Sequence, residues 1–164
     1  MTLIETMLQE LEQEADATRR VLARVPDDKL AWRPHPKART LGQLALHVAM
    51  VPGGVAAFAA QSDVQAPNFT DPDPSSAAEL VPALDESIAL ARRALGGLSD
   101  EAMAEEWRML AGDRIIFSVP RGAFLRSTML NHWYHHRGQL TVYLRALDIP
   151  VPWVYGPSAD ESPF

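Results

Sequence analysis

The stretch Asn131-His132-Trp133-Tyr134-His135-His136-Arg137-Gly138-Gln139-Leu140 contains three of the chain's five histidines. If this stretch is helical, His132 and His136 lie on one face, because residues four apart stack one turn above the other. Two imidazoles on an inward face lose their hydration unless they are hydrogen-bonded or bind an ion. The spacing alone therefore predicts either a pair of hydrogen-bonded histidines or part of a metal site.

This stretch lies within a long amphipathic helix that we expect from about Arg121 to Leu147. One line along that helix carries an apolar stripe in which histidine twice stands where leucine is expected: Leu125, Met129, His132, His136, Leu140, Tyr143 and Leu147. Asp148, Pro150 and Pro152 follow the stripe. They should end the helix and leave an extended tail.

Two helices are predicted in the first part of the chain. Apolar residues recur every three or four positions from about Leu3 to Arg24. A second helix should run from Thr40 to Ala60 and contains Pro52. Proline ends or kinks a helix unless neighbouring groups satisfy the carbonyl that it leaves free. Both helices begin with the spacing of a capping box, Thr2 with Glu5 and Thr40 with Gln43.

A third helix is expected from Ser76 to Leu95, where Ser76 and Glu79 repeat the capping-box spacing. The stretch from Gln61 to Ser75 is rich in Pro, Asp, Ser and Asn, which is typical of a loop. A connection of this length exceeds the usual link between antiparallel helices. It allows a crossover that joins two parallel helices.

The residues from Trp107 to Val119 change period and alternate as in a strand, with Gly112-Asp113 as a candidate turn. This pattern predicts a small β-hairpin before the last helix. Together with the helices it predicts an all-α fold, a four-helix bundle with a β-hairpin insertion. A chain of 164 residues is about the size of one domain, so we expect a single domain over residues 1–164.

Composition excludes several functional classes. The chain has no cysteine and therefore no disulfide and no thiol nucleophile of its own. Its net charge of -6 argues against general nucleic-acid binding. The uncharged run from Thr40 to Ser62 is long enough to span a membrane, but its glutamine, histidine, proline and glycines favour a buried bundle helix. The first residues lack a signal-peptide pattern, so a cytoplasmic location is expected.

His47 interrupts the apolar stripe of the second helix as His132 and His136 interrupt that of the last. A third inward imidazole would complete a three-nitrogen set with at least one open position for water or substrate. Nitrogen ligands favour zinc, nickel, copper, cobalt or iron over magnesium and calcium. The ligand set does not choose among these five metals, of which we expect zinc or nickel. Trp133 stands where a zinc protease would carry its glutamate base, so that reaction class is excluded.

Three segments together resemble the DinB-like (DinB/YfiT) superfamily over nearly the whole chain: Thr40-Leu41-Gly42-Gln43 leading to His47, the block from His132 to Gln139, and the tail from Pro152 to Asp160. The resemblance implies an up-down-down-up four-helix bundle, a homodimer, and one divalent metal held by His47, His132 and His136. It also implies a transferase or isomerase that uses a low-molecular-weight thiol such as bacillithiol or mycothiol. A protein without cysteine must borrow its thiol, and a coordinated thiol is deprotonated at neutral pH.

Three residues beside the expected ligands are candidates for a supporting role. His135 lies about 100° around the helix from His136 and should not reach the same ion. It would either support the ligands or a helix interface, or be a plain surface residue. Arg137 would either anchor a carboxylate of a thiol cofactor or form an interhelix salt bridge. Gln139 would either orient a ligand or bond across helices.

The function that the resemblance implies is a metal-dependent transferase acting on a small-molecule substrate, and we expect no nucleic-acid or membrane partner. One alternative is a stress-related metal-binding or ligand-binding protein without turnover. A weaker alternative is a metal-dependent hydrolase, which would need a carboxylate base that the sequence does not place near the histidines.

Overall fold

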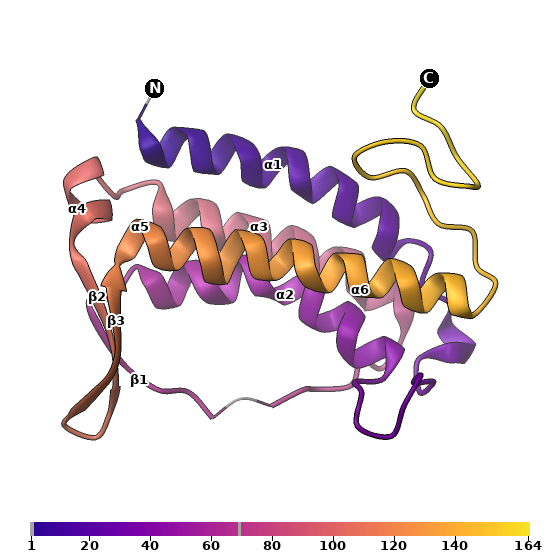
Figure 1. The fold of residues 1–164 in the computed structure, drawn as a ribbon, viewed down its shortest axis with the longest axis horizontal. Helices are drawn as coiled ribbons and strands as arrows, with labels where there is room; N and C mark the ends of the chain where they lie inside the picture. Colours follow the sequence, from indigo (N-terminus) through magenta and orange to yellow (C-terminus); the bar gives the residue numbers. More distant parts are fainter. Residues whose placement is uncertain (1, 69) are drawn as a thin grey trace.

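A computed structural model describes residues 2–68 and 70–164 (Figure 1). The long helical segments are α1 (Leu3–Leu22), α2 (Leu41–Ala59), α3 (Leu80–Leu95), and a continuous run of α5 (Arg121–Phe124), a π-helical stretch (Leu125–Asn131) and α6 (His132–Ala146). The shorter elements are β1 (Asp63–Gln65), α4 (Asp100–Ala104), β2 (Glu106–Ala111), β3 (Arg114–Pro120) and the 3₁₀ turns Asp27–Lys29 and Ala77–Glu79. The predicted helix-rich fold is confirmed.

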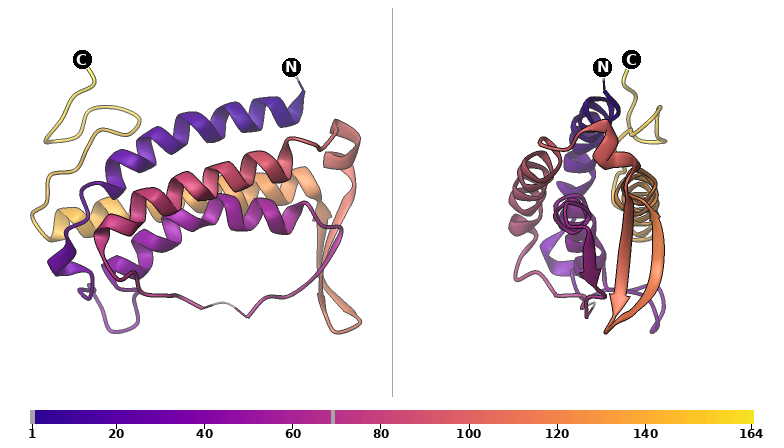
Figure 2. Two further views of the ribbon diagram at one scale, coloured as in Figure 1. Left: turned by 180° about the vertical axis from the view of Figure 1, so that it is seen from behind. Right: turned by 90° about the vertical axis from the view of Figure 1, so that its left-hand side faces the viewer.

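The long helices lie side by side around a shared apolar core. Helices α2 and α3 run in one direction, and α1 and the α5–α6 run lie in the opposite direction (Figure 1). The end-on view shows the long helices close to one another (Figure 2). Each contributes fully buried leucines, among them Leu11, Leu44, Leu84 and Leu140. The small sheet lies at one end of this arrangement and the C-terminal tail at the other (Figure 1).

Two of the three predicted capping boxes are confirmed, at α1 and α2, where the Thr2–Glu5 and Thr40–Gln43 pairs each make both reciprocal bonds. The third was wrong. Ser76 makes no capping bond with its side chain, and the Glu79 carboxylate instead accepts from the backbone N–H of Ser75 at 3.2 Å. Pro82 explains the later start of α3: beginning at Leu80 places it in the first turn, where the missing N–H has no intrahelical partner to lose.

Helix α2 continues through Pro52 because other helices satisfy the groups that proline disturbs. A helical residue at position 52 would normally donate to the carbonyl of Val48. That carbonyl instead accepts from the indole N–H of Trp133 in α6, at 2.9 Å. The next backbone N–H, that of Gly53, donates to Ser87 Oγ of α3 at 2.7 Å. A Cβ at Gly53 would lie 2.5 Å from the Ser87 carbonyl oxygen, so only glycine permits this close approach.

The predicted hairpin is confirmed as β2 and β3, which pair antiparallel around a turn where Gly112 has φ +61°. The expectation of only two strands was wrong. Strand β1, in the segment predicted as a loop, pairs parallel to β2 and completes a sheet of order β1-β2-β3. Trp107 of β2 attaches the sheet to the helices, since its ring stacks on Phe124 with centroids 3.8 Å apart and its N–H donates to Phe58 O at 3.3 Å.

Among the described residues, α2 is the one helix long and apolar enough to cross a membrane by length and composition, with mean hydropathy 1.5. More than half of that window, 56%, is buried inside the protein. The buried side chains pack against α3 and α6, as the sequence predicted for a core helix.

Candidate metal centre

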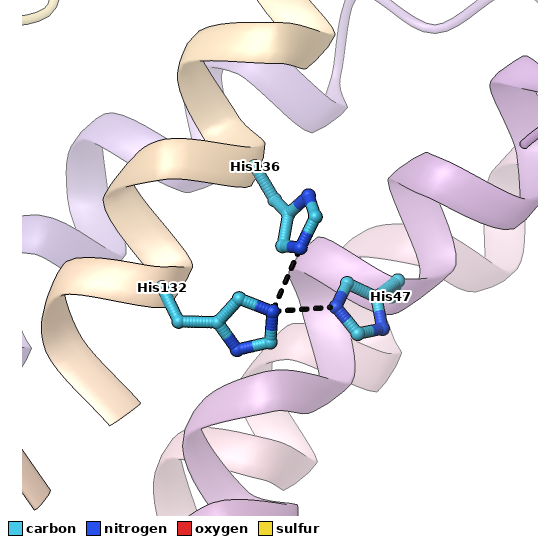
Figure 3. Close-up of side chains that lie close together, drawn as sticks. All are labelled: His47, His132 and His136. Atoms are coloured by element: carbon cyan, nitrogen blue, oxygen red, sulfur yellow. Dashed lines mark hydrogen bonds between the residues drawn. The ribbon is translucent and has the colours of Figure 1, made fainter. Parts of the chain in front are cut away.

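The structure brings His47, His132 and His136 together from two facing helices (Figure 3). The Nε2 atom of His132 lies 3.4 Å from Nε2 of His47 and 2.7 Å from Nε2 of His136. One ligand nitrogen from each ring lies within 4.8 Å of the others. The set combines a local pair, one turn apart on the last helix, with one histidine that the packing of α2 brings from 85 residues away. The three histidines are therefore close enough to hold one metal ion.

Hydrogen bonds on the far side of two rings orient their Nε2 atoms toward the cluster. Nδ1 of His136 lies 2.7 Å from Gln139 Oε1, an acceptor that requires the proton on Nδ1. Nδ1 of His132 lies 3.2 Å from the carbonyl oxygen of Thr128 and is likewise the donor. Each of these two rings in its neutral form then carries its lone pair on Nε2.

The π-helical stretch supplies the acceptor for His132. The backbone N–H of His132 donates to the carbonyls of Ser127 and Met129, on either side of Thr128. The regular α-helical bond from residue 132 to residue 128 is thereby replaced, and the imidazole takes the Thr128 carbonyl. Such π-helical turns occur often at functional sites. The sequence predicted this segment as plain α-helix and gave no signal of the altered hydrogen bonding.

Burial keeps the three imidazoles neutral. It lowers the pKa of His47 to about 4, with the nearby Arg39 guanidinium adding to the effect. Burial also lowers the pKa of His136 to about 4 and that of His132 in the same direction. Neutral imidazole is the form that binds metal, so at neutral pH these residues need not lose a proton before ligation.

The donor chemistry of the cluster fits a transition-metal ion. With protons on the Nδ1 atoms of His132 and His136, their Nε2 lone pairs face each other at 2.7 Å. Two acceptors at this distance repel unless a cation or proton lies between them. Their lowered pKa values disfavour the proton. A divalent metal with nitrogen preference would relieve the repulsion, and the three residues leave a coordination position for a further ligand.

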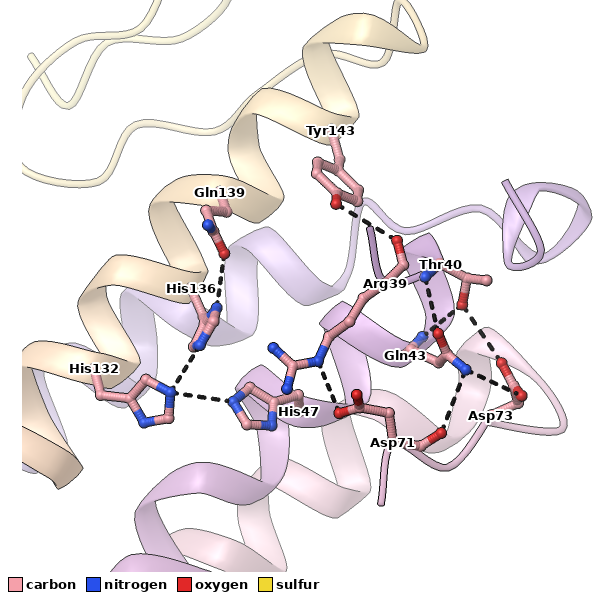
Figure 4. Close-up of polar contacts among 10 residues, drawn as sticks. All are labelled: Arg39, Thr40, Gln43, His47, Asp71, Asp73, His132, His136, Gln139 and Tyr143. Atoms are coloured by element: carbon pink, nitrogen blue, oxygen red, sulfur yellow. Dashed lines mark hydrogen bonds and ion pairs between the residues drawn. The ribbon is translucent and has the colours of Figure 1, made fainter. Parts of the chain in front are cut away.

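Arg39 and Asp71 lie beside the cluster and were missed by the sequence analysis (Figure 4). Arg39 Nε donates to Asp71 Oδ1 at 2.7 Å, in an ion pair whose side chains are 32% and 39% exposed. The charge of Arg39 lowers the pKa of all three histidines, and that of Asp71 opposes this at His47. The one available signal was position, since Arg39 directly precedes the Thr40 cap of the helix that carries His47.

Polar contacts at the start of α2 hold the loop that carries Asp71 (Figure 4). The Gln43 side-chain amide donates to the Asp71 carbonyl oxygen at 3.3 Å. The Thr40 hydroxyl donates to Asp73 Oδ1 at 3.4 Å. The residues that cap α2 therefore also place the loop next to the histidines.

The three candidate supporting residues have different positions. Gln139 contacts His136 directly. His135 is exposed, and its ring centroid lies 5.0 Å from that of His136, outside the group of converging nitrogens. Arg137 turns away from the histidines toward α1, where its Nη2 lies 2.6 Å from Glu14 Oε2. Arg137 therefore makes the interhelix salt bridge, the structural alternative, and does not lie where it could hold a cofactor at the cluster.

The salt bridge of Arg137 is part of a hydrogen-bond network that reaches from the core to the surface. Only 2% of its side chain is exposed, and it also donates to Thr18 Oγ1 at 3.1 Å and to the hydroxyl of Tyr155 in the tail. The guanidinium N–H groups donate to acceptors on α1 and in the tail. These bonds compensate for the cost of burying the charge. The tail segment that resembles the family therefore packs onto the helices through the bond between Tyr155 and Arg137.

A helix-rich fold with three histidines converging between two helices defines a class of proteins with a candidate metal centre in a helical core. Within that class, a sequence model of the DinB family matches residues 1–163, and the chain belongs to the DinB family. It is 31% identical over 163 residues to the uncharacterized protein YrdA of Bacillus subtilis, covering 96% of this chain and 91% of that protein.

Solved structures agree with this assignment. The fold is similar to that of a DinB-like protein from Bacillus cereus, with a TM-score of 0.71 and 26% identity over 92% of this chain and 97% of that one. It is also similar to a DinB-like protein from Bacillus subtilis, with a TM-score of 0.67 and 18% identity over 97% and 96% of the two chains. The family expected from the sequence is therefore confirmed.

Proposed function

We propose that this protein is a metal-dependent enzyme in which His47, His132 and His136 hold a divalent transition metal, zinc or nickel first, and that it transfers a low-molecular-weight thiol to a small-molecule electrophile. The observation that carries the proposal is the convergence of three neutral imidazoles whose Nε2 atoms face one another. A bound metal of this kind supplies Lewis acidity, which stabilises a thiolate at neutral pH.

The chain's own residues prepare the site for that chemistry. The Thr128 carbonyl and Gln139 fix the proton on the outer nitrogen of His132 and His136, which holds both rings in the binding orientation. Arg39, half-buried beside the cluster, takes over the role first considered for Arg137: its guanidinium binds an anionic group of the thiol. A cysteine-free chain offers no competing thiol.

A metal-dependent hydrolase is the second candidate, because the structure brings a carboxylate near the histidines that the sequence did not place there. Asp71 is close enough to His47 for its charge to raise the pKa of that ring. The carboxylate already accepts from Arg39 at 2.7 Å, however, and an ion pair lowers its basicity toward water. The third candidate, a stress-related metal-binding or ligand-binding protein without turnover, shares the metal site and differs only in lacking activity.

The wider organisation belongs to the same proposal. The opposite directions of α2–α3 and α1–α6 support an up-down-down-up four-helix bundle (Figure 1). Each long helix contacts at least two of the others, which supports one domain over residues 1–164. We further propose a cytoplasmic homodimer with no nucleic-acid or membrane partner. Light scattering on the purified protein tests the dimer.

Metal analysis of the untagged protein tests the first step. We expect one divalent ion per chain, with His136→Ala losing most of it and the matched neighbour His135→Ala retaining it. Equal retention in both variants would reject the three-histidine site. Turnover is then assayed with bacillithiol, mycothiol and cysteine against chlorodinitrobenzene. Metal-dependent turnover would eliminate the non-catalytic alternative, and metal binding without turnover of any thiol or ester would favour it.

A further inference from the structure

A cavity of about 400 Å³ adjoins the histidine cluster. Two histidines of the cluster, His47 and His132, belong to its lining. Further along the same helical segments, the lining includes Phe58 and Phe124. The volume lies within the range of about 300–1,000 Å³ that is usual for small-molecule sites. The candidate metal centre therefore opens onto a space large enough for the body of a ligand.

One face of α2 forms a wall of the cavity. His47, Met50, Gly54 and Phe58 recur at three or four residues and so lie on the same side of the helix. The facing wall comes from Phe124 of α5, Thr128 of the π-helical stretch and His132 of α6. Each wall includes one histidine of the cluster, so the cavity lies directly beside the candidate metal centre.

The sheet and the long loop also contribute to the lining of the cavity. Met109 of β2 and Pro67 of the loop after β1 both contribute to the lining. Stacking of Trp107 on Phe124 fixes the sheet against the last helix. The hairpin predicted from the sequence thus contributes to the shape of the cavity beside the site.

The lining is apolar except for the two histidines and Thr128. Met50, Val55, Phe58, Phe124 and Met109 present hydrocarbon or thioether surface, and among the described residues no side chain that lines the cavity is charged. A charged or strongly hydrated ligand would lose its water here without compensation. An apolar body would be stabilised by leaving water, with its polar end directed at the histidines.

Charged groups lie on a different side of the cluster. Arg39 and Asp71 influence the histidines electrostatically, but neither lines the cavity. The surroundings of the cluster are therefore divided into an apolar side and a charged side, which suits two reactants of different polarity.

We propose that the cavity binds the uncharged, apolar body of the electrophilic substrate and holds its reactive atom at the histidines, while the hydrophilic thiol approaches from the side of Arg39. The role as a substrate site rests on the proposed function. The selectivity of the cavity for apolar molecules is independent of the proposed function, because it follows from the lining alone. The substrate class is an aliphatic or aromatic electrophile without charge on its body.

Methyl NMR of the metal-free protein tests the selectivity directly. With ¹³C-labelled methionine, benzyl alcohol should shift the methyl signals of Met50 and Met109, which line the cavity, and leave unchanged that of Met7, a buried residue of α1 that does not line it. Glycerol is the polar control and should shift none of them. Equal effects of both probes, or no effect of benzyl alcohol, would overturn the proposal.

Gly54→Leu adds a bulky side chain to the lining of the cavity, and the Cβ at this position would have no atom within 4 Å. We expect benzyl alcohol to bind this variant at least tenfold more weakly. Gly138→Leu is the matched control: Gly138 is also a helical glycine with open space around its Cβ, but it does not line the cavity. Similar affinity in the two variants would place the probe elsewhere and reject the assignment.

A second arm on zinc-loaded protein separates the two proposals. Acetohydroxamate and octanohydroxamate share a metal-binding head and differ in the apolar tail. Octanohydroxamate should bind at least tenfold more tightly, and Gly54→Leu should abolish the difference. Binding of both without a difference would reject the apolar cavity alone. If neither hydroxamate binds but benzyl alcohol still does, the metal centre is rejected and the apolar cavity is retained.

Discussion

The indole N–H of Trp133 donates to the carbonyl oxygen of Val48 at 2.9 Å. Each partner is the immediate neighbour of a candidate ligand, His132 in α6 and His47 in α2. The bond exists because Pro52 has no N–H with which to satisfy that carbonyl inside α2. The missing backbone hydrogen bond in α2 therefore allows a bond that fixes the position of α6 along α2, next to the histidines.

We predict that Trp133→Phe destabilises the protein and weakens metal binding together. The Val48 carbonyl would be buried without a donor, which costs about 1–3 kcal/mol, in addition to lost packing. Urea unfolding and zinc titration measure the two effects.

Pro52→Ala in the Trp133→Phe background should recover part of the stability, because an alanine at this position has a backbone N–H that can donate the missing bond to the Val48 carbonyl. A double-mutant cycle isolates this term. If the second substitution has the same effect in both backgrounds, the proposed compensation is wrong.

Gln139→Leu should weaken zinc binding by about 10–100-fold while leaving the fold intact, because the acceptor that orients His136 is lost and the side chain is exposed. Gln139→Glu keeps an acceptor and should bind zinc at least as tightly as the parent. Competition with a chromophoric chelator provides both affinities. Equal affinity of the Leu and Glu variants would contradict a role for this hydrogen bond.

The metal-free protein should lose stability as pH falls from about 6.5 to 4. His47 and His136 have pKa values near 4 when folded and near 6.5 when unfolded, so in this interval the unfolded chain binds protons that the folded chain does not. Urea unfolding at pH 7 and pH 5 measures the change. His47→Gln with His136→Gln should flatten the pH profile, and an unchanged profile would show that these rings do not control it.

Arg137→Met should destabilise the protein strongly without removing the metal site. Glu14 would keep a largely buried carboxylate with no partner from α6, and breaking such a pair costs about 3–5 kcal/mol. We expect one zinc per folded chain in the variant. Loss of zinc from protein that remains folded would instead give Arg137 a direct role at the site.

Arg39→Met tests the opposite case. We expect little change in stability, since its ion pair with Asp71 is partly exposed, but a clear rise in KM for a thiol that carries a carboxylate. The KM for uncharged mercaptoethanol should change little. A uniform effect on both thiols would rule out anion recognition by Arg39.

The parts of the fold that could be predicted are those with a local or periodic signal. The capping boxes at Thr2 and Thr40 involve residues three apart, and the strand alternation of β2–β3 is read from consecutive residues. His132 and His136 are a helical pair, and His47 was found because it breaks an apolar stripe. These features depend on nearby residues, so the sequence alone contains the information.

The parts that were missed depend on contacts between distant segments. Strand β1 has only three residues and forms by pairing with β2. The paired residues Asp63 and Arg108 are 45 positions apart in the sequence. The position of Asp71 beside His47 results from a loop held by the cap of α2. The π-helical stretch before His132 has no sequence pattern of its own. Tertiary packing determines each of these features.

The separation of 85 residues between His47 and His132 has a consequence for a chain that has no cysteine. An ion shared by these two residues would close a long loop of the polypeptide, as a disulfide does elsewhere. Closing such a loop restricts the unfolded chain, and the effect grows with loop length. The metal would then act as a reversible cross-link between the two halves of the protein, coupling the integrity of the fold to the supply of metal.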